Sequence, residues 1–191
     1  MDRPRILAFS GSTRRESFNG RLIRFAASRF EAAGADVTLL DLGDYPLPIF
    51  NQDDEAEQGS PPGLAALKDL FETHDGIAIA CPEYNSSITP LLKNTLDWLS
   101  RTHGDEASMR AYRGKTAVLF SASGGRLGGM RGLVHVRAIL NNLGVLVLPD
   151  QLAVAAAHQA FDDRGELVGE SHRNSVDRIA EKFIDTLKRL A

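Results

Sequence analysis

Five short apolar runs alternate with amphipathic helical patterns along this chain of 191 residues. Each run is short and mostly apolar, which is typical of strands that are buried on both faces. The predicted strands are residues 5–9, 35–42, 76–82, 115–122 and 144–149. The predicted helices are residues 19–33, residues 62–74, a segment that begins at Thr89-Pro90, a segment from Leu133 to Leu143, and residues 171–190. This alternation predicts an α/β fold, a doubly wound parallel sheet of five strands with helices on both faces.

The composition is that of one ordinary globular domain, residues 1–191, with 43% hydrophobic and 25% charged residues. A net charge of −3 gives no reason to expect nucleic acid or a membrane as a partner. No apolar stretch approaches the roughly 20 residues that span a bilayer, and the start of the chain has no signal-peptide pattern. We therefore expect a cytoplasmic protein. The single cysteine, Cys81, excludes an intrachain disulfide, and the scattered histidines lack metal-ligand spacing, so no metal site is predicted.

The loop after the first predicted strand has the residues of an anion-binding site. It reads Gly-Ser-Thr-Arg-Arg-Glu-Ser-Phe-Asn over residues 11–19 and leads directly into a helix. The N-terminus of a helix attracts anions through its free N–H groups and its dipole. Ser12, Ser17 and Asn19 can add neutral hydrogen bonds, and Arg14 can add charge-assisted ones. We predict a phosphate group as the ligand; the alternative is an ordinary loop in which Asn19 caps the helix.

Two more loops carry unusual residues where a ligand is expected. In open α/β sheets, ligands bind beyond the carboxyl ends of the strands where the winding direction reverses. This rule brings together the loops after the first, third and fourth strands. Residues 81–90 are rich in Pro, Asn and Ser and can present backbone groups to a flat heterocycle, on which Tyr84 can stack. Residues 121–129 contain glycines that permit close approach of a ligand to the backbone.

Other parts of the sequence indicate structure more than chemistry. The first loop matches neither the P-loop nor the G-x-G-x-x-G pattern, and no G-x-S-x-G elbow is present, which argues against NTPases, dinucleotide-binding Rossmann domains and hydrolases of that kind. Cys81 is interpreted as a small apolar filler. Residues 51–62 are interpreted as a solvated loop and residues 101–113 as a polar loop. Trp98 is expected in packing or in a subunit contact, and Lys93 and Asn94 in capping or an interface.

Together, these motifs resemble the NADPH-dependent FMN reductase family. The resemblance rests on Gly11-Ser12-x-Arg14-x-x-Ser17-x-Asn19, on Pro82-Glu83-Tyr84-Asn85 and on Leu92-Lys93-Asn94-x-x-Asp97-Trp98. It covers nearly the whole chain and implies a flavodoxin-like fold with strand order 2-1-3-4-5. It also implies one non-covalently bound FMN per subunit, with NADPH or NADH as co-substrate. The implied activity is ping-pong reduction of a small-molecule acceptor such as a quinone, an azo or nitro compound, or chromate.

The resemblance also implies roles for individual residues. Those that would hold the FMN phosphate are Ser12, Arg14, Ser17 and Asn19, with Phe18 adding a backbone amide. Those that would edge the isoalloxazine ring are Pro82, Glu83, Tyr84 and Asn85, and those that would close its far side are Ser123, Gly124 and Gly125. No side chain is nominated as a catalytic acid or base, because the flavin carries the chemistry. Glu83 and Tyr84 are expected to influence substrate access.

The resemblance further implies a homodimer or homotetramer, with the helix that begins at Pro90 at the subunit contact and Trp98 and Arg101 near it. Two other functions on the same fold stay open. One is a flavodoxin-type electron carrier without nicotinamide turnover. The other is a flavin-free receiver domain, which needs acidic residues where this chain has Ser10-Gly11 and Cys81-Pro82. The preference between NADPH and NADH also stays open, although Arg15, Arg101 or Arg126 could meet a 2′-phosphate.

Overall fold

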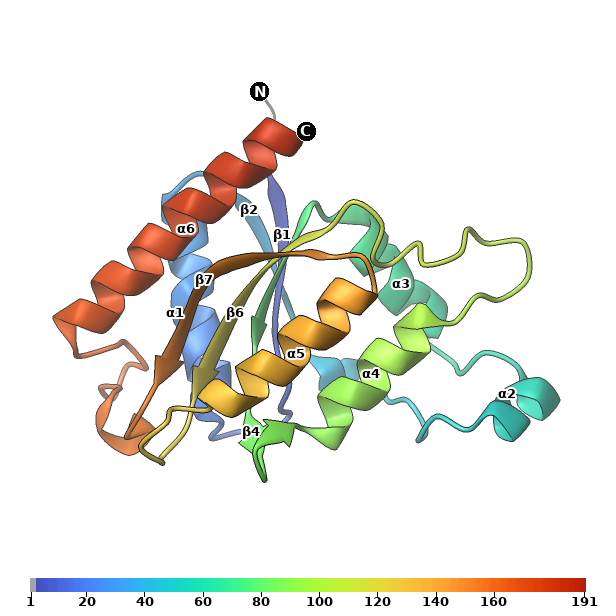
Figure 1. Cartoon of the computed structure of the whole chain (residues 1–191), viewed down its shortest axis with the longest axis horizontal. Helices are drawn as coiled ribbons and strands as arrows, with labels where there is room; N and C mark the ends of the chain where they lie inside the picture. Colours follow the sequence, from blue (N-terminus) through green and yellow to red (C-terminus); the bar gives the residue numbers. More distant parts are fainter. Residues whose placement is uncertain (1–2) are drawn as a thin grey trace.

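The computed structural model describes residues 3–191 and shows a five-stranded parallel sheet between two layers of helices (Figure 1). In spatial order the strands are β2 (Asp36–Leu40), β1 (Arg5–Ser10), β3 (Gly76–Ala80), β6 (Thr116–Ala122) and β7 (Leu146–Val154). Every neighbouring pair is parallel. The predicted order 2-1-3-4-5 is confirmed, and the winding direction reverses between β1 and β3.

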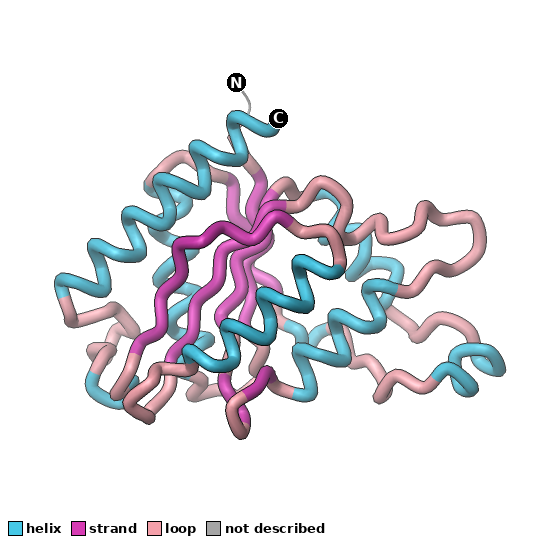
Figure 2. The backbone as a smooth tube through the Cα atoms, in the orientation of Figure 1, coloured by secondary structure: helices cyan, strands magenta, loops and turns pink. Residues whose placement is uncertain are grey.

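Helices cover both faces of the sheet, as the sequence predicts (Figure 2). One face carries α1 (Phe18–Ala32) and α6 (Glu170–Leu190); the other carries α3 (Leu64–Thr73), α4 (Pro90–Ser100) and α5 (Met130–Asn142). Alternate residues of each strand point to opposite faces, so Ile6 and Ala8 join the core under α1 and α6, while Leu7 and Phe9 join the other.

The helix ends match their sequence signals. The side chain of Ser17 accepts a hydrogen bond from the backbone of Gly20 at the start of α1, and Thr89 caps α4 with Pro90 in the first turn. The predicted stop of α1 at Gly34 also holds, because this residue adopts a φ of +95°, which suits glycine.

Three segments differ from the sequence prediction. Residues of the expected solvated loop form the exposed helix α2 (Gln52–Gln58), capped by Asn51 and with three acidic residues at its positive end. The strand predicted to end at residue 149 continues to Val154, because the register with β6 shifts there and the break at Pro149 is absorbed in an edge strand. The turn after β3 contains a small antiparallel hairpin, β4 (Glu83–Tyr84) and β5 (Ser87–Ile88).

Trp98 packs against the segments that flank α2. The indole N–H donates to the carbonyl oxygen of Pro48 (2.7 Å), and the ring meets Phe50 edge-on with centroids 5.0 Å apart. Arg101 pairs with Glu55 of α2 (2.8 Å) and lies over the Phe50 ring. Trp98 is only 2% exposed, so its contacts within the chain favour the packing interpretation.

A buried charge cluster organises the expected polar loop of residues 101–113. Lys68 of α3 is 2% exposed, and its ammonium donates to the carbonyl oxygen of Arg101 (2.7 Å) and to the carboxylate of Glu106. Arg110 binds the other oxygen of the same carboxylate (2.8 Å). Burial opposes ionisation of Glu106, but the hydrogen bonds from Lys68, the His103 backbone and Arg110 outweigh it and lower its pKa to about 2.

Candidate functional site

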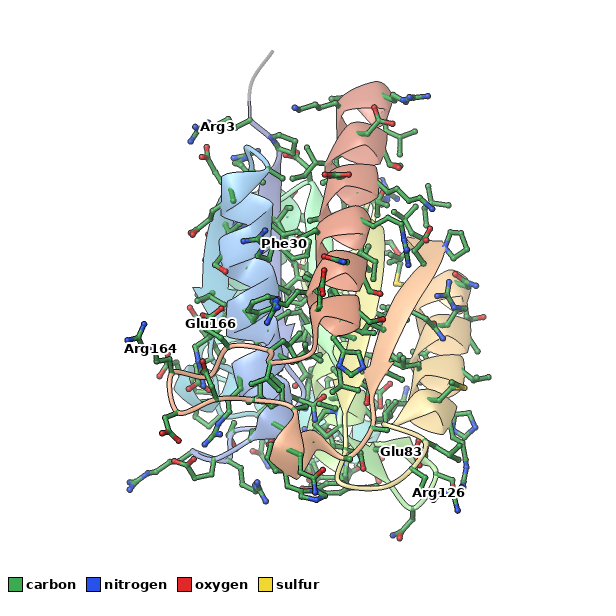
Figure 3. All side chains as sticks on the ribbon, turned by 90° about the vertical axis from the view of Figure 1, so that its left-hand side faces the viewer. Arg3, Phe30, Glu83, Arg126, Arg164 and Glu166 are labelled. Atoms are coloured by element: carbon green, nitrogen blue, oxygen red, sulfur yellow. The ribbon has the colours of Figure 1, made fainter. Side chains whose placement is uncertain are left out.

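The loops after β1, β3 and β6 meet at the carboxyl edge of the sheet around a cavity of about 200 Å³. Figure 3 shows Glu83 and Arg126, which come from two of these loops, at the same end of the molecule. The residues that line the cavity are Ser12, Arg14, Ser17, Phe18, Asn19, Pro82, Glu83, Tyr84, Ala122, Ser123 and Gly124. They include ten of the twelve residues that the sequence nominates; Asn85 and Gly125 lie outside the lining.

The first loop retains donors for an anion after its internal hydrogen bonds are made. The hydroxyl oxygens of Ser12 and Ser17 each accept a backbone N–H at 3.2 Å, which leaves both hydroxyl protons free to donate outward. The guanidinium of Arg14 donates to the carbonyl oxygen of Glu16 (2.7 Å). The backbone N–H groups of Phe18 and Asn19 belong to the first turn of α1 and have no acceptor within the helix. These donors suit a phosphate group.

The side chain of Asn19 makes different contacts from those expected. It is 4% exposed, its amide nitrogen donates to the carbonyl oxygen of Ala122 (2.8 Å), and its amide oxygen accepts the Ala122 N–H (2.9 Å). This pair of bonds ties the start of α1 to the end of β6, so the side chain of Asn19 holds two walls of the cavity together. One of its two amide protons and its backbone N–H are not used by these bonds.

The β4–β5 hairpin forms the second wall. Asn85 and Ser86 both have positive φ, +50° and +70°, as the two central residues of a type I′ turn require. The carboxylate of Glu83 accepts the N–H of Gly132 at the start of α5 (3.0 Å), so this side chain fixes the hairpin to the helix. Tyr84 is 52% exposed beside the cavity, so its ring, unlike the bound carboxylate of Glu83, is positioned to contact an incoming molecule.

The third wall contains glycines of two kinds. Gly128 and Gly129 are needed by the protein: both have positive φ, and a Cβ on Gly129 would lie 1.8 Å from the hydroxyl oxygen of Ser121. Neither Gly124 nor Gly125 has a positive φ, and a Cβ on either would meet no protein atom closer than 3.7 Å. Because the fold does not demand glycine there, their open backbone fits the close approach of a planar ligand such as a flavin ring.

Comparisons with known proteins show which family the chain belongs to. The family profile for NADPH-dependent FMN reductase matches residues 4–159. The chain belongs to this family. It is 31% identical to an NAD(P)H-dependent FMN reductase of Pseudomonas aeruginosa over 187 residues, 97% of this chain and 96% of the relative. It is 30% identical to the quinone reductase of Escherichia coli K12 over 168 residues, 86% of this chain and 85% of the relative.

Among solved structures, the flavoenzyme NAD(P)H:(acceptor) oxidoreductase FerB of Paracoccus denitrificans superposes with a TM-score of 0.82. The two chains share 25% identity, and the match covers 97% of this chain and 98% of FerB. As an FMN reductase, the chain is an oxidoreductase that uses FMN with NADPH or NADH as co-substrate. Its flavodoxin-like fold is the one that the sequence predicts.

In the described part of the chain, neither a reactive thiol nor a metal site adds to the candidate site of this FMN reductase. Cys81 is buried in the core, and burial raises the pKa of its thiol well above the usual range. Within residues 3–191, no group of three or more His, Cys, Asp or Glu side chains is arranged to hold a metal ion. Over the same residues, no helix combines the length and apolar character needed to cross a membrane.

Proposed function

We propose that this protein transfers two electrons from NADPH or NADH, through FMN held at the carboxyl edge of the sheet, to a quinone or a similar small acceptor. The observation that carries the proposal is the convergence of an anion-binding helix start, a strained hairpin with an exposed tyrosine, and an open glycine wall on one cavity. When bound, FMN would accept a hydride from the reduced nicotinamide and pass it to the acceptor.

The chain's own groups would bind FMN and orient its ring. Ser12, Ser17, Arg14 and the N–H groups at the start of α1 would hold the phosphate, because they combine a positive dipole with neutral and charged donors. Backbone groups around Glu83 and Ser123 would lie along the ring, where N–H donors stabilise the negative charge that reduction places on it. We assign no side chain as a catalytic acid or base.

One site would serve both substrates. A single open face beside Tyr84 and Gly124 would receive the nicotinamide first and the acceptor after the oxidised nicotinamide leaves. Shared use of one face predicts ping-pong kinetics, in which double-reciprocal plots at several acceptor concentrations are parallel. It also suits acceptors of varied shape, so azo compounds, nitro compounds and chromate are proposed as further substrates.

The test is an absorbance spectrum after addition of FMN and desalting, followed by anaerobic NADPH. Flavin bands that survive desalting and then bleach support the proposal, and steady-state plots with a benzoquinone test the ping-pong pattern. Retained flavin that neither NADPH nor NADH bleaches would identify an electron carrier instead. Failure to retain flavin, together with failure to reduce FMN added in excess, would reject the proposed function.

We also infer that residues 1–191 form one domain and that the protein is a homo-oligomer. The two hydrophobic cores share the central sheet, which favours one cooperative unit. Met130 and Val134 lie one turn apart on α5 and are 51% and 59% exposed, which favours coverage by another surface. A single unfolding transition and a mass of two or four subunits by light scattering would support these inferences; two transitions or a monomer would reject them.

A further inference from the structure

A second cavity of about 260 Å³ lies on the other side of the first loop, between α1 and the end of β2. It shares Ser12 and Arg14 with the cavity described above, but its other walls are different. The side chains that set its chemistry are Ser10, Arg14, Arg15, Arg24 and Asp41. The lining therefore includes three arginines and one aspartate, and the Asp41 carboxylate already accepts the N–H of Gly43 (2.8 Å). The balance of charge favours an anion.

Ser10 supplies an unused polar group in the wall of this cavity. The residue is 8% exposed, and its hydroxyl oxygen, shielded from solvent, has no hydrogen-bond partner within residues 3–191. Strand alternation places Ser10 on the same face of the sheet as Ile6 and Ala8, which is the face covered by α1. The hydroxyl is thus aimed at the space beneath the start of α1. Buried hydroxyls are normally hydrogen-bonded, so this one points to a missing partner.

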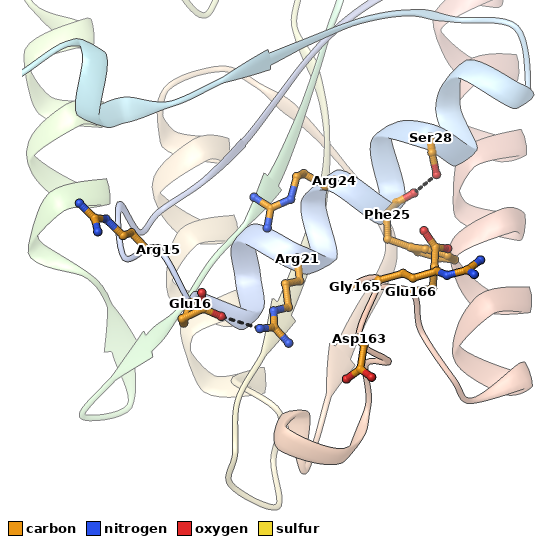
Figure 4. A pocket seen from close by; sticks show the side chains of 10 residues that line it. Arg15, Glu16, Arg21, Arg24, Phe25, Ser28, Asp163, Gly165 and Glu166 are labelled. Carbon is orange, nitrogen blue, oxygen red and sulfur yellow. Dashed lines mark hydrogen bonds and ion pairs between the residues drawn. The ribbon is translucent and has the colours of Figure 1, made fainter.

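The side chain of Arg24 lies along α1 beside the same cavity. Its Nη1 lies 3.5 Å from where a Cβ on Gly20 would be, so the guanidinium folds back one turn toward the start of α1. Figure 4 shows the neighbouring cavity, which Arg15 and Arg24 also line, with Arg24 on the first turns of α1 and Arg15 on the preceding loop. Arg21 pairs with Glu16 (2.6 Å). Within residues 3–191, neither Arg15 nor Arg24 has a hydrogen bond or an ion pair through its side chain.

We propose that this cavity is a second phosphate subsite, separate from the one for the FMN phosphate. It would take a phosphate dianion, either as a monoester or as inorganic phosphate, bound by Arg15 and Arg24 with a hydrogen bond from Ser10. Guanidinium groups match the oxygens of a phosphate in pairs, and a buried hydroxyl adds a neutral donor. Two ligands carry such a group: NADPH, through its 2′-phosphate, and free phosphate. Only the assignment to NADPH rests on the proposed function.

The first experiment titrates inorganic phosphate into the FMN-loaded protein by calorimetry, so that the flavin phosphate site is already filled. We expect saturable binding that Arg24→Gln weakens about tenfold, and that Ser10→Ala weakens by a smaller factor, because charged donors contribute more than neutral ones. Arg21→Gln is the matched control: it removes the same charge from the same helix, but residue 21 does not line this cavity. It should change the affinity by less than about twofold. Circular dichroism and flavin absorbance confirm that each variant is folded and loaded.

The second experiment distinguishes the two sources of phosphate. If the 2′-phosphate is the ligand, Arg24→Gln raises the KM for NADPH about tenfold and leaves that for NADH unchanged, and phosphate competes only with NADPH. If free phosphate is the ligand, Arg24→Gln weakens phosphate binding but neither KM changes. Absence of saturable phosphate binding, or equal weakening by Arg21→Gln and Arg24→Gln, overturns the subsite. Calorimetry needs bound FMN but no turnover, so it gives a result even if neither NADPH nor NADH reduces the flavin.

Discussion

Replacing Asn19 with alanine tests whether this side chain acts as a structural tie or as a ligand of the flavin phosphate. The substitution leaves the N–H and the carbonyl oxygen of Ala122 without partners in a buried site. Each unpaired group costs about 1–3 kcal/mol, so the free energy of unfolding should fall by about 3 kcal/mol. For a chain of this size, that corresponds to a fall of roughly 6–12 °C in Tm. The loss should be present without FMN.

The assay is urea unfolding of the flavin-free protein, followed by titration with FMN. Ser17→Ala is the comparison, because it removes only a helix cap and should cost about 1 kcal/mol. The Asn19→Ala variant should also bind FMN more weakly, since the end of β6 is no longer held against α1. An unchanged unfolding free energy combined with a large loss of FMN affinity would refute the structural role. It would restore the sequence-based view that the amide binds the phosphate directly.

Three further predictions follow from the same structure. Gly124→Ala should change the free energy of unfolding by less than about 0.5 kcal/mol but lower the affinity for FMN in a fluorescence titration. Gly129→Ala should lower the free energy of unfolding by about 2 kcal/mol or more, because a Cβ at residue 129 would collide with Ser121. The pKa of Glu106 is about 2 in the folded protein and about 4.3 in the unfolded chain. Its ionised contact with Lys68 therefore contributes fully to stability when the pH is above the unfolded pKa, and this stabilisation is lost as the pH falls toward the folded pKa. The difference in urea stability between wild type and Glu106→Gln should therefore narrow from about pH 6 to about pH 3, and a constant difference would contradict this account. Cys81 should resist iodoacetamide in the native protein and react after unfolding, as measured by mass spectrometry, and Cys81→Ala should retain turnover.

Much of the fold could be predicted from the sequence because its signals are local. Apolar runs identified all five strands, but only β1, β3 and β6 are buried along nearly their whole length; the edge strands β2 and β7 are partly exposed. Thr89-Pro90 and Gly34 marked helix ends through their own backbone preferences. The strand beyond Pro149 could not be predicted in this way. Proline normally ends a strand, and only the position of β7 at the sheet edge permits the chain to continue.

The position of the candidate site was easier to predict than the contacts of its side chains. The rule for open α/β sheets predicts that the loops after β1, β3 and β6 meet, and in the structure they line one cavity. It could not show that Asn19 is bound to Ala122, 103 residues away, or that Glu83 is bound to the start of α5. Both partners are backbone groups, which leave no trace in the choice of side chain. The second cavity could not be predicted for a related reason: Ser10 and Arg24 line the same cavity only because α1 packs on the sheet.

The irregular edge at β7 limits how this protein can associate with other chains. An open strand edge can act as a template on which a second chain adds a strand, and this is a common route to aggregation. Here Pro149 offers no N–H, Arg137 binds the carbonyl oxygen of Val147 (3.1 Å), and Asp150 carries a charge paired with Lys182 (2.9 Å). Such an edge opposes the growth of a continuous intermolecular sheet from β7.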